Sequence, residues 1–207
     1  MKVSTIRKTT APLIPYITIG IGLLVLHNAW VAMLGYHVGI AVVMAWSKYR
    51  PGLKQVYKGK GVWIPLIGGL GGVGSGVLLN LLWPALSIPH NINAYINSVG
   101  LNARTWPIFI GYFIIVNPLL EEYFWRGFLN STARMPVLND LLFAGYHLMA
   151  FAGHIATVWL IAIFLGLVAG AWAWRQINRN NIGLLASTVS HLAADIIIIL
   201  TIYHFCR

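Results

Sequence analysis

The sequence contains very few acidic side chains. Among its 207 residues only four are Asp or Glu, whereas 14 are Lys or Arg. All charged residues together make up 9% of the chain, hydrophobic residues make up 58%, and the mean hydropathy is +0.76. Because soluble domains carry about 25% charged residues, this composition excludes an ordinary soluble domain and predicts a protein that crosses a membrane several times.

Cysteine is almost absent as well. Cys206 is the only one, so an intramolecular disulfide is excluded. The net charge of +10 does not indicate a nucleic-acid partner, because the basic residues fall in short links between apolar runs. That distribution is typical of the cytoplasmic loops of membrane proteins, and we therefore expect the lipid bilayer rather than nucleic acid as the surrounding partner.

Long apolar runs fill most of the chain. A transmembrane helix needs roughly 20 apolar residues. The run from Pro12 to Trp46 is long enough for two helices, with a break near His27–Asn28 or Gly35–His37. Further spans are predicted at residues 62–86, 105–130, 139–152, 155–174 and 182–204, and the one at 139–152 is short. The sequence thus predicts an all-α, multi-pass transmembrane helical bundle of about seven spans, formed by residues 1–207 as a single integral membrane domain.

The basic residues predict the orientation of this bundle. They concentrate before the first span and in three of the later links, in the groups Lys2, Arg7 and Lys8; Lys48, Arg50, Lys54, Lys58 and Lys60; Arg134; and Arg175 and Arg179. Cytoplasmic links carry the excess of Lys and Arg. We expect a cytoplasmic N-terminus, an external C-terminus and, in a prokaryotic cell, a location in the inner or plasma membrane.

Three of the four acidic residues lie inside apolar segments. Glu121 and Glu122 end the run that begins at Trp106, and Asp195 precedes a run of isoleucines. Ionisable groups at membrane depth cost several kcal/mol, so they face the protein interior and usually serve a function. These three carboxylates are therefore the first candidates for chemistry.

The spacing around these acids suggests separate roles for them. Residues four apart share a helix face, so Glu122 and Arg126 form an internal ion pair, while Glu121 points about 100° away. Pro118 disturbs the turn before Glu121, which can open a helix at a membrane site. We expect Glu121 to face a polar pocket and the Glu122–Arg126 pair to support it.

Two histidines recur at a similar depth in other spans. His191 precedes Asp195 by four residues, and His147 follows Phe143 by four. At 1.5 Å per residue, Glu121, His147 and His191 all lie roughly 12–14 Å inside the predicted cytoplasmic boundary. The three could therefore meet in one pocket, where Asp195 would hold the imidazole of His191 in one tautomer and Phe143 would pack against His147.

These residues form an ordered set of three motifs on separate spans. Glu121 to Arg126 is E-E-x-x-x-R, Phe143 to His147 is F-x-x-x-H, and His191 to Asp195 is H-x-x-x-D. In this order they resemble the signature of the CPBP family, which comprises CAAX prenyl endopeptidases and bacteriocin-processing or self-immunity (ABI) proteins. The resemblance covers about Trp106 to Tyr203, within a motif-bearing core of about residues 105–204.

The resemblance implies a glutamate-type intramembrane endopeptidase. Glu121 with His147 would activate water, and His191 with residue 195 would stabilise the oxyanion. Ras-converting members of the family carry Asn at the last motif position, where this chain has Asp195. Because an ionised Asp accepts hydrogen bonds but donates none, Asp195 is either protonated or acts by orienting His191. The Asp in place of Asn concerns the specificity for CAAX substrates, and it does not remove the peptidase chemistry.

Several functions stay open at this point. The leading one is hydrolysis of a peptide bond in a membrane-associated protein or peptide: a prenylated CAAX-like tail, a leader peptide or a C-terminal anchor. This reaction needs no cofactor and no metal, although a zinc peptidase with Glu121, His147 and His191 as ligands is an alternative. A non-catalytic immunity protein and a proton-coupled transporter are the alternatives from other classes.

Overall fold

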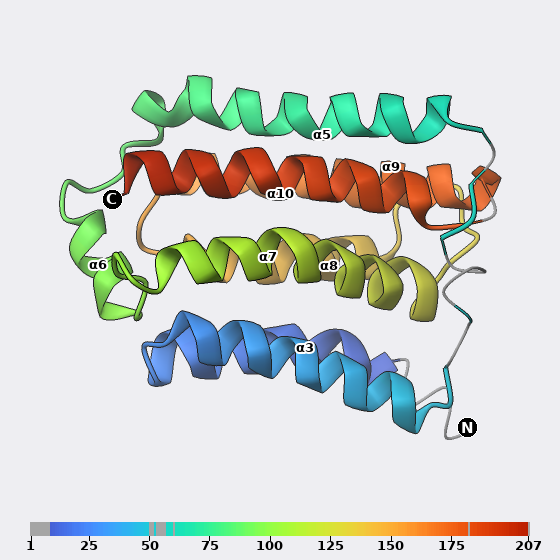
Figure 1. Ribbon diagram of the computed structural model, residues 1–207, viewed down its shortest axis with the longest axis horizontal. Coiled ribbons are helices and arrows are strands. Elements are labelled where there is room, and N and C mark those ends of the chain that lie inside the picture. Colours follow the sequence, from blue (N-terminus) through green and yellow to red (C-terminus); the bar gives the residue numbers. More distant parts are fainter. Residues whose placement is uncertain (1–8, 50–51, 53–56, 60, 182, 207) are drawn as a thin grey trace.

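The computed structural model describes residues 9–49, 52, 57–59, 61–181 and 183–206, and all regular secondary structure in these residues is helical (Figure 1). The predicted all-α class is confirmed. The helices run back and forth nearly along one axis.

The first apolar run forms a helical hairpin. A 3-10 turn at Ala11–Leu13 (η1), helix α2 (Ile14–Ile19) and a π-helical turn at Gly20–Val25 (η2) make its first arm, and α3 (Ala29–Trp46) makes its second. His27 has a positive φ of 47°. The side chain of Asn28 accepts a hydrogen bond of 3.0 Å from the backbone N–H of Val31 and so caps α3. The first of the two predicted break positions is therefore the correct one.

The remaining predicted spans also appear as helices. They are α5 (Trp63–Leu82) with the 3-10 turn η3 (Trp83–Leu86), α7 (Trp106–Glu121) with the π-helical turn η4 (Glu122–Phe128), α8 (Leu138–His147) with the 3-10 turn η5 (Leu148–Ala150), α9 (Thr157–Asn181) and α10 (Leu185–Phe205). The short α6 (Ile92–Ser98) lies in the polar link between α5 and α7.

The predicted number of about seven spans is a slight overstatement. Five helices of the described residues are long and apolar enough to cross a membrane: Ala29–Trp46, Trp63–Leu86, Trp106–Phe128, Thr157–Arg179 and Leu185–Phe205. The segment Ala11–Val25 is apolar but shorter, and helix α8 has only 10 residues. Most of the basic residues that predict the orientation, among them Lys2, Arg50 and Lys54, lie outside the described residues, and the cytoplasmic N-terminus stays a prediction.

Helix α10 is central to the part of the bundle that carries the motifs. It lies between α5 and α7, with α3 on the far side of α7 (Figure 1). Close approach of α5 depends on Gly68, Gly72 and Gly76, all of which are buried. A Cβ atom at Gly72 would collide with the carbonyl oxygen of Ser190, so only glycine fits there.

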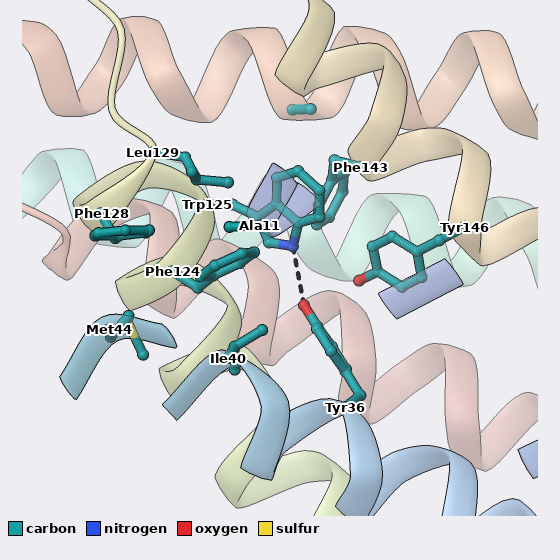
Figure 2. Close-up of a cluster of buried hydrophobic side chains, with 11 residues drawn as sticks. Ala11, Tyr36, Ile40, Met44, Phe124, Trp125, Phe128, Leu129, Phe143 and Tyr146 are labelled. Atoms are coloured by element: carbon teal, nitrogen blue, oxygen red, sulfur yellow. Dashed lines mark hydrogen bonds between the residues drawn. The ribbon is translucent and has the colours of Figure 1, made fainter. Parts of the chain in front are cut away.

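An aromatic core fixes the acidic turn η4 against its neighbours. Phe124 and Trp125 of η4 pack with Tyr36 of α3 and with Phe143 and Tyr146 of α8 (Figure 2). The indole N–H of Trp125 donates a 2.9 Å hydrogen bond to the hydroxyl of Tyr36. Because this cluster packs α3, η4 and α8 against one another, it also positions Glu121 and His147.

The position of Arg175 differs from the expectation that it lies in a cytoplasmic link. Helix α9 continues to Asn181, and Arg175 is buried within it. Its guanidinium lies 2.7 Å from the Asp140 carboxylate and also donates to the carbonyls of Ala133 and Met135. Asp140, the fourth acidic residue of the chain, therefore forms a buried ion pair with Arg175. Through its bonds to Asp140, Ala133 and Met135, Arg175 connects α9 to α8 and to the link before α8.

Candidate active site

The helix geometry changes at the acidic pair. Pro118 lies inside α7, where it removes one backbone donor, and the chain passes from α-helix to π-helix between Glu121 and Glu122. Single π-helical turns inside α-helices occur often at functional sites. The wider turn leaves both neighbouring carboxylates within reach of His191 on α10.

His191 is the centre of the acidic cluster. Its Nδ1 lies 3.1 Å from Glu122 Oε1, and its Nε2 lies 3.6 Å from Glu121 Oε2 and 3.5 Å from Asp195 Oδ1. His191 and Asp195 therefore share a face of α10, as their spacing predicts. The contact between His191 and Glu122 was not expected, since the sequence assigns Glu122 to Arg126 alone.

The predicted pair of Glu122 and Arg126 is present. Arg126 Nη1 lies 2.9 Å from Glu122 Oε1, and both side chains are buried. The guanidinium also lies over the rings of Phe143, at 4.1 Å, and Trp174, at 4.9 Å. Aromatic faces stabilise a cation at these distances, so the rings compensate in part for the lost hydration of Arg126.

Glu121 has one occupied and one free oxygen. The hydroxyl of Tyr146 donates a short hydrogen bond to Oε1. Oε2 is buried beside His191 and has no hydrogen-bond partner among the described residues. A buried carboxylate oxygen without a partner is costly, so this atom is the natural place for a water molecule or a substrate N–H.

His147 joins the cluster through its aromatic neighbours. Its Nδ1 donates a hydrogen bond of 2.7 Å to the carbonyl of Phe143, because a carbonyl can only accept. Its ring centroid lies 4.6 Å from that of Phe143 and 4.1 Å from that of Tyr146. With hydrogen on Nδ1, the Nε2 of His147 has a free lone pair. The side chain that contacts Glu121 directly from α8 is that of Tyr146.

The site contains polar residues that the sequence analysis did not select. Asn117 donates from its amide to Asp195 Oδ2 at 3.1 Å, and its own oxygen lies 3.2 Å from the Nε2 of His37. Trp174 stacks on His191 with a centroid separation of 4.7 Å. One signal was available: Asn117 precedes Glu121 by four residues and therefore shares its helix face.

The zinc alternative stays a prediction. Among the described residues, no three His, Cys, Asp or Glu side chains are arranged to hold a metal ion. Both nitrogens of His191 already face carboxylates, and Nδ1 of His147 is bonded to a carbonyl. A small cavity lies beside Arg126 and Phe143, and none of the four predicted catalytic residues lines it.

Fold and site together define a helical membrane protein with a buried cluster of carboxylates and histidine between its helices. The comparison with protein families narrows this class. Residues 103–197 match the model of the type II CAAX prenyl endopeptidase Rce1-like family, and this range contains all three motifs. Over this range the chain is similar to the CAAX protease family. No curated protein and no solved structure matches it.

Proposed function

We propose that this protein hydrolyses a peptide bond of a membrane-associated substrate, with Glu121 as the general base. The observation that carries the proposal is the position of Glu121 Oε2, which is free of hydrogen bonds among the described residues and lies 3.6 Å from His191 Nε2. A water molecule held by Oε2 would lie beside an imidazole that can stabilise negative charge.

The reaction follows from these contacts. Glu121 Oε2 takes a proton from the water as its oxygen attacks the scissile carbonyl carbon. The carbonyl oxygen becomes an oxyanion, which an N–H of His191 stabilises. Glu121 then returns the proton to the amide nitrogen as the carbon–nitrogen bond breaks, so the products are a carboxylic acid and an amine. Tyr146 holds Oε1 in place during both transfers.

The charges in the site suit this role of His191. Three carboxylates surround the ring, and the cationic side chain of Arg126 is bound to one of them. A protonated His191 balances a second carboxylate, since an unpaired charge buried at this depth is costly. An imidazolium held from Nδ1 by Glu122 would present its Nε2–H to the oxyanion. His147, whose Nε2 is free, would orient the attacking water from α8.

The candidate substrates follow from the family match and from one motif position, residue 195, at which this chain differs from the Ras-converting members. The match to CAAX prenyl endopeptidases supports a prenylated C-terminal tail as the first substrate to test. Asp195 stands where Ras-converting members carry Asn, so a leader peptide and a C-terminal membrane anchor are tested beside it. All three are membrane-associated chains that could approach a buried site from the bilayer.

The test uses the purified protein in liposomes with three fluorescent peptides: a farnesylated CAAX peptide, a leader peptide and a C-terminal anchor peptide. The assay is run in water enriched in ¹⁸O. We expect at least one peptide to be cleaved, with one ¹⁸O atom in the new carboxyl group by mass spectrometry, and no loss of activity with 1,10-phenanthroline. Loss with the chelator and recovery with zinc would favour the zinc peptidase. No cleavage by protein that still unfolds cooperatively would contradict hydrolysis.

A further inference from the structure

Asp195 is the end of a hydrogen-bonded chain that crosses the bundle away from the acidic cluster. The chain consists of Tyr112 and Asn117 on α7, His37 on α3 and Asp195 on α10. Helix α7 lies between α3 and α10 (Figure 1), so these residues connect three helices. The hydroxyl of Tyr112 lies 2.8 Å from His37 Nδ1, His37 Nε2 lies 3.2 Å from Asn117 Oδ1, and Asn117 Nδ2 lies 3.1 Å from Asp195 Oδ2.

The chain is buried where it meets the site. His37 is 4% exposed, Asn117 is 3% exposed and Asp195 is 7% exposed. Buried polar groups need partners, and here both ends of the Asn117 amide and both nitrogens of His37 have one. A histidine and an asparagine that served only to join α3 to α7 would not need to extend to a third residue beside the reacting groups.

The direction of hydrogen bonding in this chain depends on Asp195. If Asp195 is ionised, it accepts from the Asn117 amide, the Asn117 oxygen accepts from His37 Nε2–H, and His37 Nδ1 accepts from Tyr112. If Asp195 is protonated and donates, the amide must turn over and His37 must carry its hydrogen on Nδ1 instead. The protonated nitrogen of His37 therefore reports whether Asp195 Oδ2 accepts a hydrogen bond from Asn117 or donates one to it.

We propose that His37 and Asn117 are positioning residues of the active site, which hold Asp195 as a hydrogen-bond acceptor so that its other oxygen orients His191. The inference rests on the proposed function for its catalytic consequence, but not for its structural content. It assigns Asp195 the orienting role and gives the lone histidine of α3 a function. Neither residue contacts the proposed reacting atoms directly.

The first test does not depend on activity. The ¹⁵N NMR spectrum of the histidine-labelled protein in detergent micelles gives the protonated nitrogen of each ring, and the variant His37→Gln identifies the signals of His37. We expect hydrogen on Nε2 of His37 in the wild-type protein. A His37 ring without hydrogen on Nε2 would overturn the proposal, since Asn117 would then have to donate to His37 rather than to Asp195.

The second test measures cleavage of the farnesylated CAAX peptide, or of whichever peptide in the set is cleaved. We expect Asn117→Leu and His37→Leu to lower kcat by about 10–100-fold, as for outer partners that orient a functional histidine, with little change in KM. His37→Gln, which keeps a donor toward Asn117, should recover a large part of the loss. Tyr16→Phe is the matched control, because it removes a 2.8 Å interhelical hydrogen bond, to the carbonyl of Leu142, outside the chain.

The two tests separate the possible failures. Hydrogen on Nε2 of His37 without any peptide cleavage would retain the positioning of Asp195 and count against the proposed peptidase. Cleavage that is unchanged in His37→Leu and Asn117→Leu, in protein with a normal melting temperature, would overturn the positioning role. Equal losses in His37→Leu, His37→Gln and Tyr16→Phe would also overturn it, because a general loss of packing would then explain them.

Discussion

His191 occupies the position in the cluster where one ring can serve several carboxylates. Its two nitrogens face Glu122 on one side and Glu121 and Asp195 on the other, while Trp174 covers its flat face. A ring held from three sides has little freedom to rotate, so its Nε2 is preorganised toward the place where charge develops. Glu122 can hold the ring in place only if its own buried charge is balanced. Arg126 supplies the positive charge that balances it.

Arg126 should therefore matter for folding more than for chemistry. Removing one partner of a buried ion pair leaves the other charge unpaired, which costs about 3–5 kcal/mol. We expect Arg126→Ala to lower the midpoint of thermal unfolding in detergent strongly. Arg179→Ala, which removes an exposed cation of α9, is the control and should change the midpoint little. Equal midpoints for the two variants would show that the Glu122–Arg126 pair does not stabilise the fold.

The sequence predicted the contacts within single helices but not the contacts between helices. The pairs Glu122–Arg126 and His191–Asp195 were predictable, since residues four apart on a helix always share a face. The bond from Asn117 to Asp195 and the bond from Tyr146 to Glu121 depend on which faces of two helices meet. Spacing along the chain does not determine that, and so Asn117, Tyr146 and His37 were not found.

At the scale of helices, the close contact between α5 and α10 depends on glycine residues, which have no side chain to keep the two backbones apart. Gly72 of α5 is buried against the backbone of Ser190 and Ala194. On the same helix, a Cβ atom added at Gly74 would meet no atom of the described residues within 4 Å. The neighbouring helix carries His191 and Asp195. Any displacement of α10 would therefore move half of the site.

These two glycines allow a matched comparison. We expect Gly72→Ala to force α5 and α10 apart, to lower the midpoint of thermal unfolding and to reduce cleavage. Gly74→Ala should be neutral or slightly stabilising, since alanine favours a helix over glycine by about 1 kcal/mol. The measurement is thermal unfolding of both variants in the same detergent. A Gly72→Ala protein as stable as Gly74→Ala would mean that the two helices do not pack as closely as described.

The extents of the helices were predictable where apolar runs end in polar residues, and less so elsewhere. The boundaries of α5 and α10 follow the predicted spans 62–86 and 182–204 closely. Helix α9 extends past residue 174 because Arg175, instead of facing water, pairs with the buried Asp140. The change to π-helix after Glu121 left no periodic signal, since it alters a single turn.

For the whole molecule, the orientation in the membrane is the principal prediction. The link that leads to α5 and the C-terminal end of α9 lie at one end of the bundle, and the link that leads to α6 lies at the other (Figure 1). The first end carries Lys58 and Arg179, and the second carries His90. All three side chains are exposed. The excess of basic residues in the links at the first end indicates that this end is cytoplasmic.

Single cysteines test this orientation in a Cys206→Ser background. Cys206 itself is buried, which raises the pKa of its thiol to about 11, so it reacts poorly even before removal. We expect a membrane-impermeant maleimide added to intact cells to label His90→Cys, and to label Lys58→Cys and Arg179→Cys only after the cells are opened. Labelling of Lys58→Cys but not His90→Cys in intact cells would reverse the orientation.

The central claim is that Glu121 is the base of a hydrolytic reaction, and the variant Glu121→Gln tests it most directly. The amide keeps the size of the side chain but cannot accept the proton of the attacking water. General bases contribute about 10²–10⁴-fold to rates, so we expect kcat for the cleaved peptide to fall by about that factor, with the melting temperature preserved. Full activity of Glu121→Gln on the same peptide would contradict the assignment of Glu121 as the base.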